Sequence, residues 1–273
     1  MFKFNMQKTA IATVFAVTSS VSLAFGPGNQ PSVPTTGWTK IQDNGNVQIY
    51  QKGSEQVYMQ AIDIKNGGKL QFLQQQNGTD SSGRKLFQRK NLVDWYSYAG
   101  NNPPAFVNAQ FFNNAINPTT FSFGVKSNGV IVTKGDDIKP NLRQLEIYNN
   151  WGAIVRDYAP SFFDNSATTN MIVGYSHTVD ISAGGAIGRT MVCVPGWYDP
   201  YPYVLILSTY NYTRANALTQ FSNWNCVNSR VIQFDGSGSS QLKTSGGKVM
   251  YGLNSQNTVD KRTFPQGIVS RNN

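Results

Sequence analysis

The chain has 273 residues, a formal net charge of +9, and hydrophobic side chains at 40% of its positions. This is enough chain for one large domain with a core of its own. The lysines and arginines are scattered rather than gathered into a patch, so nucleic-acid binding is not predicted, although the excess charge suits an anionic polymer such as a phosphate-bearing glycan.

Residues 1–24 have the composition of a secretory signal peptide. Lys3 and Lys8 flank the start of an apolar run at residues 9–17, and small residues lead to Ala24. The run is too short to span a bilayer stably, and no later segment is predicted to insert into a membrane. We therefore expect cleavage after Ala24 and an exported protein, either periplasmic or secreted.

The next segments predict an extended arm followed by strands. Three prolines favour an extended arm over residues 25–36, and a single domain is expected over residues 37–273. Alternation of apolar and polar side chains predicts antiparallel strands at residues 47–50 and 57–64. A short helix is expected at residues 91–98.

The middle of the chain carries a hairpin signal. Asn128-Gly129 lies between apolar residues within 121–132, and this pair is typical of a two-residue β-turn. Further strands are expected at residues 145–148, 171–175, 191–194 and 204–207.

The clearest helix is expected at residues 213–224, where Thr213 can cap the first turn. It lies between a strand ending near Ser208 and another ending at Phe234, which indicates a βαβ crossover. The predicted fold is therefore α+β: a strand-rich single domain with a mixed β-sheet and few flanking helices.

Two cysteines, Cys193 and Cys226, remain in an exported chain. An even pair in an oxidising compartment predicts one disulfide, with two buried thiols as the alternative. Neither cysteine has the spacing of a metal site, and no metal or other cofactor is predicted.

The most informative stretch is residues 231–242, where an apolar run ends in Asp235 and a turn of glycines and serines. It predicts a strand that delivers one carboxylate to a tight polar loop. The loop glycines allow positive φ angles, and the serines with the backbone amides can hold anionic oxygen. The alternative is a plain polar turn in which Asp235 bonds the next amides.

Several ordered segments resemble the phosphodiester glycosidase family. Residues 108–113 are similar to its Asn-Gly/Ala-x-Phe-Phe segment, and residues 188–190 place an arginine where the family has one at the head of a strand. Residues 213–217 look like its Thr-x-x-x-Ala helix start, and residues 262–269 resemble its closing segment. Residues 235–240 match Asp-Gly-Gly-Gly-Ser-Ser, with a serine in place of the second glycine.

The resemblance implies hydrolysis of the glycosidic bond between a sugar, of the N-acetylhexosamine kind, and a phosphodiester. Phosphate is a good leaving group whose charge must be held, and the resemblance implies Arg189 for that role. Asp235 is then the base, the nucleophile or an ion pair for the transition state. A structural salt bridge is the alternative for Arg189.

The expected substrate-binding residues contact the sugar or the phosphate. They are Asn108, His177, Gly236, Ser237, Gly238, Ser239 and Ser240. Asn108 has a turn-forming role as its alternative, and His177, the only histidine, has a surface or capped-turn role as its alternative. If position 237 needs a positive φ, Ser237 is strained where the family has glycine.

Two other functions stay open at this point. One is a non-catalytic envelope or exopolysaccharide glycan-binding protein on the same fold. The other is a phosphodiesterase that acts at phosphorus with a metal, which is disfavoured because a chain with one histidine lacks a His/Asp-rich cluster. Asp136-Asp137 fit either a hard cation or, preferably, a solvated acidic turn.

Overall fold

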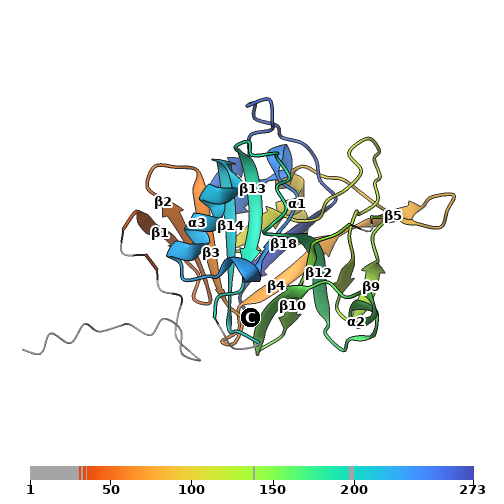
Figure 1. The fold of residues 1–273 in the computed structure, drawn as a ribbon, viewed down its shortest axis with the longest axis horizontal. Helices are drawn as coiled ribbons and strands as arrows, with labels where there is room; N and C mark the ends of the chain where they lie inside the picture. Colours follow the sequence, from red (N-terminus) through yellow and green to blue (C-terminus); the bar gives the residue numbers. More distant parts are fainter. Residues whose placement is uncertain (1–30, 32, 35, 138, 197–199) are drawn as a thin grey trace, which may run out of the picture.

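The computed structural model describes residues 31, 33, 34, 36–137, 139–196 and 200–273, and the predicted signal peptide lies outside them. Strands make up 44% of the described residues and helices 13%, so the predicted strand-rich fold with few helices is confirmed. Figure 1 shows the strands gathered into one body with short helices at its surface. No helix in the described ranges is long and apolar enough to cross a membrane.

The larger of the two main sheets has eleven strands within the described residues. Nine follow the order β1-β2-β3-β14-β13-β15-β12-β10-β11, while β8 pairs with β12 and β9 pairs with β8. Their bounds are β1 Trp38–Asp43, β2 Val47–Lys52, β3 Val57–Asp63, β8 Val125–Ser127, β9 Val130–Thr133, β10 Leu142–Tyr148, β11 Gly152–Asp157, β12 Asn170–Ser176, β13 Ile187–Cys193, β14 Tyr203–Tyr212 and β15 Val231–Gln233.

The second sheet has the order β17-β16-β7-β18-β4, and a separate hairpin pairs β5 with β6. These strands are β4 Lys69–Gln74, β5 Gln76–Thr79, β6 Lys85–Phe87, β7 Ala105–Asn108, β16 Gln241–Thr244, β17 Val249–Tyr251 and β18 Gln266–Arg271. The helices are α1 Leu92–Ala99, α2 Pro160–Asn165 and α3 Arg214–Asn223, with single turns η1 Asn228–Arg230 and η2 Ser237–Ser239.

The main core lies between the two sheets. Ile206 of β14 and Ile232 of β15 belong to the same buried cluster as Val107 of β7 and Ile268 of β18. Leu205 and Leu207 on β14 point the other way, into a cluster beneath α3. Because successive side chains of a strand point to opposite faces, a strand buried on both faces must be apolar throughout its length.

The prediction of a mixed sheet is wrong, because every strand pair in the described chain is antiparallel. Strands β14 and β15 flank β13, and each is antiparallel to it. They therefore point the same way, and α3 connects them across β13. The predicted crossover exists, but its two strands, β14 and β15, are not paired with each other because β13 lies between them.

Local signals were reliable for turns and helix caps. Asn128 and Gly129 have φ angles of 51° and 80° in the β8–β9 hairpin, as a mirror-image turn requires. Thr213 caps α3 by accepting from the Asn216 amide. The predicted helix and hairpin are both confirmed.

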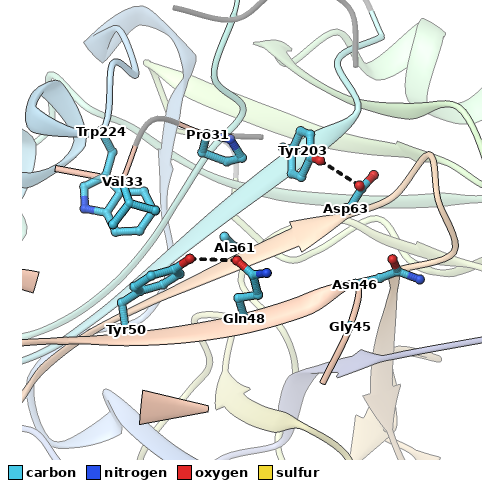
Figure 2. A pocket seen from close by; sticks show the side chains of 10 residues that line it. All are labelled: Pro31, Val33, Gly45, Asn46, Gln48, Tyr50, Ala61, Asp63, Tyr203 and Trp224. Carbon is cyan, nitrogen blue, oxygen red and sulfur yellow. Dashed lines mark hydrogen bonds between the residues drawn. The ribbon is translucent and has the colours of Figure 1, made fainter. Parts of the chain in front are cut away.

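The described residues of the predicted N-terminal arm include Pro31 and Val33, which pack on the sheet near the end of α3. Val33 joins the cluster that contains Trp224, and Pro31 with Val33 lines a cavity of about 40 Å³. Figure 2 shows Tyr203 donating to Asp63 and Tyr50 donating to Gln48 around this space. The predicted catalytic and substrate-binding residues are not among its ten lining residues, so we do not place the functional site here.

The predicted disulfide is confirmed. Cys193 at the end of β13 is bonded to Cys226, just after α3, and both cysteines are buried. The bond ties the crossover helix to the strand that it crosses.

Replacing both cysteines with alanine is expected to lower the free energy of unfolding by about 3–4 kcal/mol, because the bond closes a loop across a sequence separation of 33. Urea unfolding with and without a reductant measures this loss. The reductant should destabilise the wild type and leave the double variant unchanged. Equal stability of the wild type and the variant would contradict a constraining bond.

Candidate active site

The side chain of Asn108 joins the two sheets at the centre of the site. It is fully buried at the end of β7 and donates from Nδ2 to the Asp235 backbone oxygen at 2.6 Å. Its Oδ1 accepts from the Thr190 hydroxyl at 2.5 Å and from the Gln241 amide at 3.1 Å. The amide thus fixes the backbone of the Asp235 loop rather than projecting into open space.

Asp235 follows β15, as predicted, and its amide donates to the Ala109 oxygen at 2.9 Å. The residue is only partly exposed. Burial raises the pKa of its carboxyl from 3.8 to about 6, although neighbouring groups, including Arg262 and Arg89, oppose the rise. A carboxyl with such a pKa is a carboxylate at neutral pH and can accept a proton there.

The two cations whose charges lower the pKa of the Asp235 carboxyl are Arg89 and Arg262, which lie far apart in the sequence. Arg262 forms an ion pair with Asp260 through Nε and Nη2, at 2.8 and 2.6 Å. Arg89 donates to the Thr263 oxygen at 3.2 Å, and its guanidinium lies 4.9 Å from the centre of the Phe112 ring. Burial lowers the pKa of Arg89, and the charge of Arg262 lowers it further.

Two buried polar atoms of this cluster have no hydrogen-bond partner within the described residues. They are the Ser239 hydroxyl and Nε of Arg89. The Ser239 hydroxyl is close enough to the Asp235 carboxyl to oppose the rise of its pKa, but it meets no acceptor in hydrogen-bonding geometry. Unsatisfied buried donors beside a carboxylate and two arginines suit an anionic or hydroxyl-bearing ligand.

The residues of the loop after Asp235 pack closely against neighbouring segments of the chain. Ser237 has a φ of 59°, in the left-handed region, so this position does need a positive φ and the serine is strained there. A Cβ at Gly238 would lie 2.4 Å from the Asp260 Cβ, so only glycine fits against that residue. Ser240 is buried, with its hydroxyl 3.1 Å from that of Thr190. Gly236 is also buried.

Arg189, the other expected catalytic residue, is not brought to Asp235. Thr190 faces Asn108, and because neighbouring side chains on a strand alternate, Arg189 points to the opposite face of β13. There it is 1% exposed and donates to the Tyr212 oxygen at 2.7 Å and the Ser182 hydroxyl at 2.6 Å. Its ion partner is Asp180, at 3.6 Å.

His177 lies at the end of β12 on the side of this second charged cluster. Its backbone oxygen accepts from Arg214 at 2.6 Å, and its Nδ1 lies 3.3 Å from the Ser176 hydroxyl. Burial lowers the pKa of the ring, and the charges of Arg143 and Arg214 lower it further. The structure therefore groups His177 with Arg214 rather than with Asp235.

Comparisons with known proteins give a fold and no family. The sequence matches no protein-family model and no curated protein. The structure is similar to the zebrafish N-acetylglucosamine-1-phosphodiester alpha-N-acetylglucosaminidase catalytic domain auto-inhibited by its pro-peptide, with a TM-score of 0.50 and 13% identity over 81% of this chain and 90% of that one. At this identity the likeness shows a shared fold alone.

Two further solved structures are similar at lower scores. A hypothetical protein from Synechocystis has a TM-score of 0.49 and 10% identity over 85% of this chain and 61% of that one. A protein described as exported, from Burkholderia pseudomallei, has a TM-score of 0.43 and 11% identity over 82% and 74%. Of these three structures, the zebrafish domain has a TM-score of 0.50, and this chain shares its fold.

Sequence reasoning missed Arg89 and Arg262 as a pair. Arg262 was noticed only as part of the closing segment at residues 262–269, and Arg89 was not singled out among the scattered basic residues. No local pattern predicts this pair. The two arginines lie at one place because the backbone of Lys90 forms a bridge with that of Phe264.

Ser237→Gly is expected to raise the free energy of unfolding by about 0.5–1 kcal/mol, because glycine adopts a positive φ without the left-handed penalty. Chemical denaturation of the two proteins measures the difference. Ser54→Gly is the matched control: Ser54 is exposed and has no positive φ, so that change should destabilise by a similar amount. A loss of stability in Ser237→Gly would contradict the strained conformation.

Asp235→Asn is expected to stabilise the protein at neutral pH by about 1–3 kcal/mol. Since the folded pKa is about 6 and the ordinary value is 3.8, the folded state binds the proton more tightly, and wild-type stability falls as pH rises from about 4 to 6. The advantage of the variant should therefore appear above pH 6 and vanish below pH 4. Denaturation curves across this range measure it.

Asp180→Asn is the matched control for this pH dependence. Burial raises the pKa of Asp180, but hydrogen bonds from Ser182 and the charge of Arg189 outweigh it and leave the pKa lowered. Its carboxylate therefore contributes stability at neutral pH, and the variant should lose stability there. The same sign for both variants would contradict the environment described for Asp235.

Proposed function

We propose that this protein is an exported hydrolase that cleaves the glycosidic bond between an N-acetylhexosamine-like sugar and a phosphodiester. The observation that carries the proposal is Asp235, a carboxyl with a pKa of about 6 beside the two cations Arg89 and Arg262. The resemblance of the sequence segments and the fold shared with the zebrafish domain support the same reading. The disulfide suits an oxidising compartment outside the cytoplasm.

Arg262 is our candidate for the group that holds the phosphate. Its Nε and Nη2 donate to Asp260, while Nη1 makes no hydrogen bond within the described residues, and the side chain is 26% exposed. Arg89 has fewer N–H groups available for a phosphate, because both of its Nη atoms donate to Asn114 in a neighbouring loop. It adds positive charge and an unpaired Nε. A phosphate held this way leaves without a strong general acid.

Asp235 acts on the other side of the bond in this proposal. As a carboxylate it takes a proton from the attacking water, or it stabilises the positive charge that develops on the sugar ring. The Ser239 hydroxyl and the loop amides hold sugar or phosphate oxygen. Asn108 is a positioning residue, since its amide fixes the Asp235 backbone and Thr190.

Arg189 and His177 have no contact with Asp235 among the described interactions, so we assign the phosphate to Arg262 in place of Arg189. The rival function is an envelope or exopolysaccharide glycan-binding protein, which would use the same arginines without turnover. The raised pKa of Asp235 favours hydrolysis, because a binding site for an anion gains nothing from a buried carboxylate.

The mature protein is expected to release N-acetylglucosamine from its methyl 1-phosphodiester, with activity rising as pH increases through about 6 if Asp235 is the base. In water labelled with oxygen-18, the label should enter the sugar. Asp235→Asn should lower kcat/KM by at least about 100-fold, and Arg262→Gln by about 10- to 100-fold with a higher KM. Arg214→Gln, a similarly exposed arginine paired with Asp180, is the control that should keep activity.

Label that enters the phosphate would contradict cleavage at the sugar carbon. If no substrate is turned over while an anionic glycan binds and Arg262→Gln weakens that binding, the rival binding function replaces the hydrolase.

A further inference from the structure

A groove of about 420 Å³ opens at the surface beside the Asp235 cluster. Four segments form it: the turn before β6, residues 112–113, residues 120–122 and residues 136–137. The first segment belongs to the β5–β6 hairpin, which extends from the body of the domain in Figure 1. None of the expected site residues lines this groove.

The groove is connected to Asp235 through a short run of backbone. The Asp235 amide donates to the Ala109 oxygen, and three residues further on Phe112 lines the groove. Three residues of fully extended chain span about 10 Å, which is the upper limit for the distance between Ala109 and Phe112 along this run. Phe112 also contacts Arg89, whose charge acts on Asp235. The Phe112 ring therefore lies between the groove and the arginine that acts on Asp235.

The lining is suited to a ligand rich in hydroxyl groups. Asp136 and Asp137 offer carboxylate oxygens that accept hydrogen bonds, Asn113 offers both a donor and an acceptor, and a serine and a threonine add hydroxyls. Phe112 supplies one aromatic ring on which the apolar face of a sugar can stack. This mixture of one ring and several polar groups is typical of sites that bind carbohydrate rather than an apolar molecule.

The charged side chains that line the groove are two carboxylates, Asp136 and Asp137, and one arginine, Arg84. Arg84 pairs with Asp80 at 2.7 Å and reaches Asp136 at 3.4 Å, so its single charge faces more than one carboxylate. The charge of Asp137 is felt by Tyr175, where it adds to the effect of burial in raising the pKa of the phenol. A negative groove repels carboxylate-bearing sugars and accepts neutral or amine-bearing ones.

We propose that this groove binds neighbouring residues of a neutral or amino-sugar glycan, so that the substrate is a phosphate-linked oligosaccharide rather than a single capping sugar. The placement of this glycan beside a scissile bond rests on the proposed function, whereas its binding in the groove does not. Phe112 stacks on one ring, and Asp136 with Asp137 accepts from its hydroxyls or its amine.

Calorimetric titration of the full mature protein tests the groove with three probes of equal length: the N-acetylglucosamine tetramer, the glucosamine tetramer and the galacturonic acid tetramer. The first two are expected to bind at least about 10-fold more tightly than the acidic one. Asp137→Asn should weaken glucosamine tetramer binding at least about fivefold and narrow its advantage over the acidic probe. Asp137 is exposed, so the fold should tolerate the change.

Phe112→Ala should weaken binding of both favoured tetramers. Trp151→Ala is the aromatic control, because Trp151 is 71% exposed in a separate groove at the β10–β11 turn. Its removal should leave all three affinities unchanged. Equal affinity for the three probes, no effect of Asp137→Asn, or loss of binding in the Trp151 variant would overturn the proposal.

The two proposals fail in different measurements. Hydrolysis of the methyl phosphodiester does not require the groove, so turnover without tetramer binding would overturn the groove and leave the hydrolase. Tetramer binding that depends on Asp137, in a protein without turnover, would support the groove and overturn the hydrolase.

Discussion

The buried side-chain amide of Asn108 is the interaction on which the site depends. One side chain satisfies a backbone oxygen of the Asp235 loop, a backbone amide at the start of β16 and a hydroxyl of β13. These groups belong to both main sheets; Asn108, Thr190 and Gln241 are fully buried, and Asp235 is partly exposed. Since an unsatisfied buried polar group costs about 1–3 kcal/mol, the amide sets how the sheets meet and therefore where the carboxyl of Asp235 lies.

How much the sequence predicts depends on the range of the interaction. Strand alternation, the Asn128-Gly129 turn and the Thr213 cap are local, and each was predicted in place. The carboxylate at Asp235 and its tight loop were also predicted from neighbouring residues. The pairing of Arg89 with Arg262 depends on strand order between distant segments, and the face taken by Arg189 depends on the register of β13. Neither is encoded in a short window.

The Asp235 loop gathers features that reduce stability. It contains a strained serine at position 237, an unpaired buried hydroxyl at Ser239 and a carboxyl whose ionisation is opposed by burial. Backbone strain and unsatisfied polar groups of this kind are typical of a site selected for activity rather than for stability. The second charged cluster, around Arg189 and Asp180, shares two of these features: Ala183 has a φ of 48°, and Nη1 of Arg189 and Nε of Arg214 have no hydrogen-bond partner within the described residues.

The position of β18 determines when folding can be completed. This strand, residues 266–271, pairs with β4 on one side and β7 on the other, so it is an interior strand of the second sheet and joins β4 to the rest of it. Asn108 is paired with Gly267 of β18, so this part of the second sheet is complete only after these late residues have been synthesised. Long-range pairing of this kind is slow to form. The second sheet, unlike the larger one, is therefore completed only by the last strand of the chain to be synthesised.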